Sequence, residues 1–245
     1  MQKPHSVNFF ATCLVDLLYP EAGLAGMQLL RRAGIDVRFP QNQTCCGQPA
    51  FNSGYRKDAL TVARAQLDCF DDDLPIVVPS GSCAGMIKQH WPELFAGEPD
   101  EPRALAAADR TYELTQFLVD VLAIELSDLG APMKIAIHTS CAARREMGVA
   151  GHIEALIGQL DRVEVTEQAR SAECCGFGGT FAVKQPDVSG AMVNDKTDAL
   201  RATGAARVIS QDCGCLMNIG GAFEKQGDGP TTQHIAEFLW ERTQG

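Results

Sequence analysis

The chain has 245 residues, and its 31 acidic side chains outnumber its 21 basic ones, which gives a formal net charge of −10. The length is sufficient for one large domain or for two domains of roughly 100–150 residues. An acidic balance argues against a nucleic-acid-binding surface and against a patch for anionic lipid, because both need clustered Lys and Arg. No apolar run reaches the roughly 18 residues of a transmembrane helix, so no membrane span is expected.

The N-terminal stretch 1–23 has an apolar run, but it lacks the features of a secretion signal. Asp16 interrupts the run, and Pro20 and Glu21 stand where a cleavage site would have small residues. We interpret the stretch as a strand followed by a loop and expect a cytoplasmic protein.

The remaining chain alternates between two hydrophobic periods. Short β-rich runs that end in polar residues and a cysteine are predicted as strands at 7–13, 76–83, 134–141 and 207–215. Apolar residues recur every three or four positions at 22–34, 56–70, 112–126 and 187–204, which predicts helices there. Gly34 and Gly204 stand where a C-cap glycine is common, and the tail 231–242 is predicted as a closing amphipathic helix.

This alternation predicts the α/β class, with a small, mainly parallel sheet and flanking helices in each half of the chain. The stretch 98–110 is rich in Pro, Asp and Ala and is the predicted linker. We therefore place the first domain at 1–110 and the second at 111–245.

The ten cysteines are the unusual feature of the composition. In a cytosolic chain of this length, such a number indicates metal binding or redox chemistry. Eight of them form two sets with matching spacing, at offsets of 128 to 132 residues: Cys13, Cys45, Cys46 and Cys83, then Cys141, Cys174, Cys175 and Cys215. A match of this kind indicates an internal duplication.

The predicted topology brings each set of cysteines to one place. The first and last members of each set follow strands, and the carboxyl ends of parallel strands meet at one edge of a sheet. Each half is therefore expected to hold a four-cysteine site at that edge. Four thiolates suit zinc or an iron–sulfur cluster. Adjacent cysteines at a glycine turn favour a cluster, since structural zinc sites usually take their cysteines two to four residues apart, but zinc remains an alternative.

The pattern C-x31-CC-x36-C, repeated as C-x32-CC-x39-C with a glycine after each pair, resembles the cysteine-rich CCG domain. This domain occurs in heterodisulfide reductase and in the iron–sulfur subunit of glycolate oxidase. The stretches VVPSGSCAGM, ECCGFGGTF and CGCLMNIGG resemble the lactate-oxidising branch of this family, over about residues 7 to 240.

The resemblance implies that the eight cysteines bind iron–sulfur clusters, with the 4Fe–4S type as the expected form. It also implies an electron-transfer subunit that works with a second iron–sulfur subunit and a third subunit to oxidise L-lactate to pyruvate. The family's fuller motif ends in Cys-x-x-Cys, and here Ser80 and Asp212 replace the first cysteine of that pair. Either residue is a candidate oxygen ligand.

Several residues near the two sets have two interpretations. Cys213 is a candidate alternate ligand, whereas Cys69 is expected to pack as a small apolar side chain. His138 is a ligand or proton donor, or, as we expect, a hydrogen-bonded core histidine. Arg144 and Arg145 could bind a carboxylate such as a small 2-hydroxy acid, and we favour a solvated surface for them.

Two other functions remain open at this stage. One is a zinc-stabilised scaffold or assembly subunit, and the other is a thiol–disulfide redox protein that uses CCG or 213–215 as its reactive pair. No Ser-His-Asp arrangement and no dinucleotide-binding fingerprint is visible. If the chain is an oxidoreductase subunit, the sequence shows no self-contained catalytic site.

Overall fold

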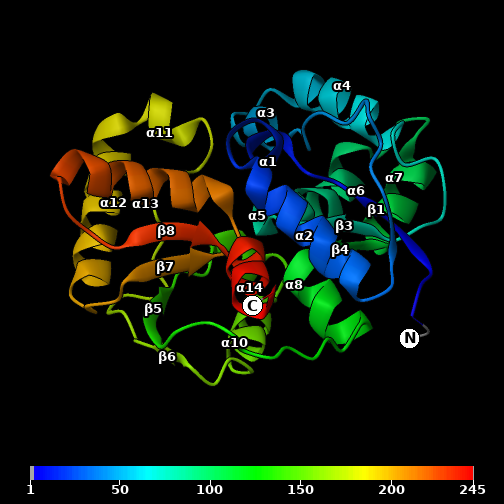
Figure 1. Cartoon of the computed structure of the whole chain (residues 1–245). Helices are drawn as coiled ribbons and strands as arrows, with labels where there is room; N and C mark the ends of the chain where they lie inside the picture. Colours follow the sequence, from blue (N-terminus) through cyan, green and yellow to red (C-terminus); the bar gives the residue numbers. More distant parts are fainter. Residues whose placement is uncertain (1–2, 245) are drawn as a thin grey trace.

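The computed structural model describes residues 3–244 and contains two parallel sheets, one from each half of the chain (Figure 1). The first sheet has the order β2-β1-β3-β4, built from β1 (Ser6–Phe9), β2 (Asp36–Arg38), β3 (Ile76–Val78) and β4 (Thr111–Glu113). The second has the order β6-β5-β7-β8, built from β5 (Met133–Ile137), β6 (Val163–Val165), β7 (Arg207–Ser210) and β8 (Thr231–His234). The α/β class and the duplication are thus confirmed; the domain ends at 1–2 and 245 lie outside the described residues.

The two sheets are equivalent down to single hydrogen bonds. All neighbouring strands pair in parallel. The backbone N–H of Phe10 donates to Val77 and that of His138 donates to Ile209, each over 2.9 Å. Phe10 and His138 therefore occupy the same place in the two halves. The strands are short, and the apolar run Ile76–Val78 is buried throughout, as expected for strands that helices cover on both faces.

The helices that cover the two sheets are mostly short. Those of the first half are α1 (Cys13–Leu18), α2 (Pro20–Arg32), α3 (Gln48–Asn52), α4 (Arg56–Leu67), α5 (Gly81–Gly85), α6 (Trp91–Leu94), α7 (Glu101–Asp109) and α8 (Leu114–Gln116), with π-helical turns η1 (Met86–His90) and η2 (Phe117–Val121). Those of the second half are α9 (Cys141–Arg145), α10 (Ala150–Ile157), α11 (Phe181–Lys184), α12 (Pro186–Arg201), α13 (Cys213–Gln226) and α14 (Ile235–Gln244). Within residues 3–244, none of the helices has the length and apolar character of a membrane span.

The predicted linker 98–110 is wrong. Most of it forms α7, whose buried face of Ala104, Ala107 and Ala108 packs into the first half. Alanine is a strong helix former, and Pro at the start of a helix is well tolerated, so the composition that suggested a linker also suits a helix. β4 follows directly and pairs with β3. The first sheet thus extends past residue 110, and we move the proposed domain boundary to the segment 122–132 between the sheets.

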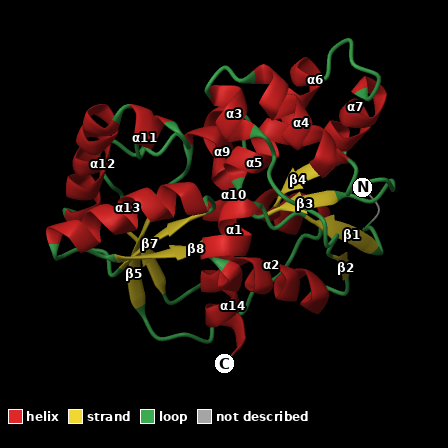
Figure 2. Ribbon diagram, turned by 90° about the horizontal axis from the view of Figure 1, so that it is seen from above, coloured by secondary structure: helices red, strands yellow, loops and turns green. Residues whose placement is uncertain are grey.

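The last helix of each half packs against the other half. Helix α14 lies along α2 (Figure 2), and α8 with η2 contacts α10. These helices share one buried apolar cluster, to which Leu29, Phe117, Ile153 and Phe238 contribute. The predicted closing helix 231–242 is partly wrong. Residues 231–234 form β8, and the helix begins at Ile235.

Candidate metal centres

The first four-cysteine set gathers at the carboxyl ends of β1 and β3. Cys13 begins α1, Cys45 and Cys46 lie in the loop before α3, and Cys83 lies in α5. The Sγ atoms of Cys13 and Cys45 are 3.7 Å apart, and those of Cys46 and Cys83 are 3.4 Å apart. In the strand order β2-β1-β3-β4 the connections from β1 and β3 leave in opposite directions, which opens a crevice there.

The second set repeats this arrangement. Cys141 begins α9 and its thiol interacts with Cys174, while Cys175 interacts with Cys215 in α13. The structure therefore brings together all eight cysteines that the sequence singled out, in two equivalent groups. Within each group the adjacent cysteines interact with each other, and each also has a second partner, at a different strand end.

Glycine at the third position of each CCG turn is required by the backbone. Gly47 has φ +89° and Gly176 has φ +85°, in the left-handed region. A Cβ at Gly176 would lie 2.8 Å from the backbone oxygen of Ser189, and one at Gly47 would lie 3.0 Å from that of Ala59. The turn therefore needs glycine for its conformation and for the close approach of the following helix.

The peptide groups of these turns are also held in place. Trp91 Nε1 donates to the carbonyl of Cys46 over 3.0 Å, and Asn218 Nδ2 donates to that of Cys175 over 2.8 Å. The backbone N–H of Gly176 points at the sulfur of Cys174, 3.4 Å away. Such N–H groups stabilise negative charge on a sulfur.

The electrostatics of the thiols favour a bound cation. Hydrogen bonds from Cys13 and Cys46 hold the pKa of the Cys45 thiol well below its usual range. Interaction with that thiolate, together with burial, raises the pKa of Cys13 and of Cys46. Four sulfurs this close cannot all ionise without a compensating positive charge, and metal ions supply it. The donor set therefore fits a metal or an iron–sulfur cofactor.

The two candidate oxygen ligands act as helix caps. Ser80 Oγ accepts from the backbone N–H of Cys83 over 3.4 Å, and Asp212 Oδ1 accepts from that of Gly214 over 3.3 Å. Asp212 Oδ2 also accepts from the N–H of Ser82 over 2.9 Å, so this carboxylate links the two halves. Burial raises its pKa.

Cys213 lies next to the first site, and it also remains close enough to Cys215 of the second set for a Coulombic interaction. It is 2% exposed, belongs to the apolar cluster between the halves, and lines a cavity of about 260 Å³ together with the first cysteine set. Burial is the main reason that the pKa of its thiol is raised. Phe177, Thr180 and Val183 of the second half complete the wall of this cavity.

His138 differs from the expectation of a hydrogen-bonded core histidine. It is buried, and neither ring nitrogen has a hydrogen-bond partner among residues 3–244. A ring nitrogen of His138 and the sulfurs of Cys175 and Cys215 all lie within 4.8 Å of one another. Burial lowers the pKa of this imidazole to about 3, which keeps it neutral. The sequence signal was its position three residues before Cys141.

The other candidates take structural places. Cys69 is half-buried and its thiol donates to the carbonyl of Ala65 over 3.5 Å, as a packed helical cysteine does. Arg144 is half-buried and bonds to the carbonyl of Ala172, and Arg145 is exposed. The two arginines therefore point to different surroundings and do not form a carboxylate clamp with each other.

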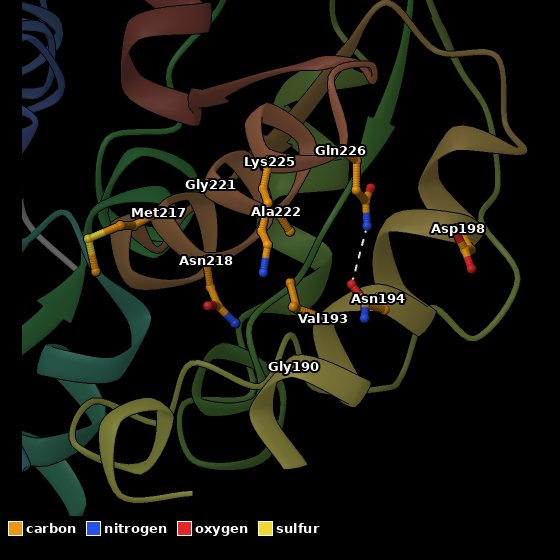
Figure 3. A pocket seen from close by; sticks show the side chains of 10 residues that line it. All are labelled: Gly190, Val193, Asn194, Asp198, Met217, Asn218, Gly221, Ala222, Lys225 and Gln226. Atoms are coloured by element: carbon orange, nitrogen blue, oxygen red, sulfur yellow. Dashed lines mark hydrogen bonds between the residues drawn. The ribbon is translucent and has the colours of Figure 1, made fainter. Parts of the chain in front are cut away.

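A larger hollow of about 680 Å³ lies between α12 and α13 (Figure 3). Gln226 and Asn194 line it, and Gln226 Nε2 donates to Asn194 Oδ1 over 3.2 Å. Asn218 and Lys225 also line it, and no cysteine does.

Comparison with known proteins agrees with this geometry. The cysteine-rich domain CCG matches residues 7–88 and 135–220, one match for each sheet. The chain belongs to the CCG cysteine-rich domain family. "Lactate utilization protein A" of Shouchella clausii is 46% identical over 237 residues, which cover 96% of this chain and 98% of that protein. Proteins of the same name from Geobacillus sp. and Bacillus subtilis are 45% and 43% identical, each over 96% of this chain and 99% of the relative.

A similar fold is also seen in a solved structure. A hypothetical protein from Helicobacter pylori superposes with a TM-score of 0.67 over 99% of this chain and 49% of that protein. The sequence identity is 13%, so this likeness bears on the fold alone.

Proposed function

We propose that this chain is an iron–sulfur electron-transfer subunit of a lactate-utilisation system that oxidises L-lactate to pyruvate. The assignment to lactate utilisation is supported by the names of three relatives, which are 43% to 46% identical over nearly the whole chain. The paired cysteine sets support the electron-transfer role. By this proposal the chain works in the cytoplasm with a second iron–sulfur subunit and a third subunit.

One observation carries the choice of an iron–sulfur cluster over zinc. In the first set, Cys45 pairs with Cys13 and the adjacent Cys46 pairs with Cys83. Cys45 and Cys46 also interact with each other, so the dipeptide joins the cysteines of both strand ends into one row of four sulfurs, and this suits a group with several metal atoms. A single tetrahedral ion is usually held by two residues of a wider knuckle.

The proposed ligands are the eight cysteines of the two sets, four for each centre. An iron–sulfur cluster, when bound, supplies one-electron transfer. The chain's own contribution is to hold the thiolates, to aim N–H groups such as that of Gly176 at sulfur, and to keep water away from the buried members Cys46 and Cys175. The walls of the cavity beside the first set are largely apolar, through Leu14, Phe177 and others.

Metal and sulfide content of protein purified without oxygen tests this proposal. We expect iron and acid-labile sulfide in similar amounts, reduced by about half in Cys45→Ser and in Cys174→Ser, because each variant damages one set. Cys69→Ser is the matched control and should retain the full content, since Cys69 lies outside both sets.

Two results would contradict the proposal. Zinc without sulfide would favour the scaffold function, and a metal-free protein with a reactive thiol pair would favour the thiol–disulfide function. Loss of content in the Cys69→Ser control would show that the variants act through general unfolding.

A further inference from the structure

His138 is a buried polar side chain of the second half for which the described residues around it provide no hydrogen-bond partner. It is 1% exposed, and both ring nitrogens lack a hydrogen-bond partner among the described residues. Buried polar groups are nearly always partnered, and exceptions commonly mark a bound ion or a functional site. The ring stands at the end of β5, where the second cysteine set gathers.

We infer that His138 supplies a nitrogen ligand to the metal centre of the second site, beside Cys175 and Cys215, and that the first site has no such ligand. The inference rests on the proposed function in one respect, because it takes the second cysteine set to be a metal centre.

The spacing of the donor atoms fits this role. A metal bound tetrahedrally to an imidazole nitrogen and a thiolate sulfur separates the two donor atoms by about 3.6 Å. The ring nitrogen and the two sulfurs lie within 4.8 Å of one another, so a small side-chain rotation brings the nitrogen within reach of the metal centre that the sulfurs hold. Imidazole nitrogen is a common metal ligand.

The first site has a phenylalanine at the equivalent place. Phe10 makes the same backbone hydrogen bond as His138, over 2.9 Å in both halves. Its ring is fully buried and packs edge-on against Phe70, with ring centroids 5.9 Å apart. The two halves thus have the same cysteines and differ in the side chain beside them, which is a phenylalanine in the first half and a histidine in the second.

The two halves also differ in a buried charge near the cysteines. Lys196 is 1% exposed and lies close enough to Cys174 and Cys175 for a Coulombic interaction. Ala59 and Ser189 contact the glycines of the two CCG turns in the same way, and seven residues further along the helix the first half has the neutral Gln66 where the second half has Lys196. A nitrogen ligand and a nearby cation both stabilise a more reduced centre.

Pulsed electron paramagnetic resonance of the full-length protein tests this inference. Protein labelled with 15N-histidine is purified without oxygen and reduced, and the nitrogen hyperfine coupling of its metal centres is measured. Metal and sulfide analysis of the same sample decides the proposed function independently. If that analysis finds zinc, the measurement is made on cobalt-substituted protein, so that the ligand set is still tested.

We expect a strongly coupled histidine nitrogen in the natural protein. The coupling should be lost in His138→Phe, which copies Phe10, and the midpoint potential of the second centre should become more negative. Phe10→His is the matched control, because it alters only the first half and should leave the second-site coupling unchanged.

Three results would overturn the inference. The first is natural protein whose metal centres show no histidine coupling, even with iron and sulfide present. The second is coupling that persists in His138→Phe, and the third is a second cysteine set that binds neither iron nor cobalt. The measurement on the natural protein does not depend on whether a variant folds.

Discussion

Glu113 should make the stability of this protein fall as the pH rises from 5 to 8. Its carboxyl is fully buried at the end of β4, where Oε2 accepts from the N–H of Thr115 over 2.8 Å and from that of Gln116 over 3.3 Å. Oε1 has no partner among the described residues. Burial raises the pKa of this carboxyl to about 7, against the lowering effect of those hydrogen bonds.

The sign and the magnitude follow from proton linkage. A raised pKa means that the folded protein binds this proton more tightly than the unfolded chain, in which the pKa is near 4.5. The stabilisation is therefore complete below about pH 4.5 and is lost as the pH rises through about 7. At about 1.4 kcal/mol for each pH unit, the loss between pH 5 and pH 8 amounts to about 2–3 kcal/mol.

Urea unfolding of the natural protein and of Glu113→Gln, at several pH values, measures this effect. The amide is neutral at every pH, so the difference in unfolding free energy between the two proteins should change by about 2–3 kcal/mol from pH 5 to pH 8. Glu164→Gln is the control, because that carboxylate is 60% exposed in its pair with Lys134. A difference that stays constant across this range would refute the reasoning.

Three further predictions concern packing and the second site. Asp128→Ala should lower the free energy of unfolding by about 3–5 kcal/mol, because it leaves the buried guanidinium of Arg242 without the carboxylate that accepts its two bonds of 2.8 and 2.7 Å. Urea unfolding checks this, and a loss below about 1 kcal/mol would contradict it. Gly176→Ala should remove the metal of the second set alone, by metal analysis, whereas Gly190→Ala, where a Cβ meets open space, should retain it. Lys196→Gln should make the potential of the second centre more negative in a redox titration, and an unchanged potential would exclude an electrostatic role.

Much of the candidate site could be predicted from the sequence because its pattern is local and repeated. The strands before Cys13, Cys83 and Cys141 were identified from short β-rich runs, and the topology rule for parallel sheets placed the cysteines at one edge. The positive φ of Gly47 and Gly176 after the cysteine pairs was not predicted and is known from the structure.

Other features depend on packing between distant segments. β4 was predicted as part of a helix, because a strand of three residues has no clear period of its own and is defined by pairing with β3. The position of Cys213 beside the first site arises because α13 begins at the contact between the halves. The sequence placed it by its distance from Cys215 alone.

The sequence by itself determined the α/β class, the duplication and the eight gathered cysteines, because hydrophobic period and residue spacing encode them within each half. The tertiary structure alone decided that α14 packs on α2 across the halves, and that His138 is buried beside Cys175 and Cys215 without a hydrogen-bond partner among the described residues. These features depend on which surfaces meet after the chain has folded, and surfaces that meet across the fold leave no periodic signal in the sequence.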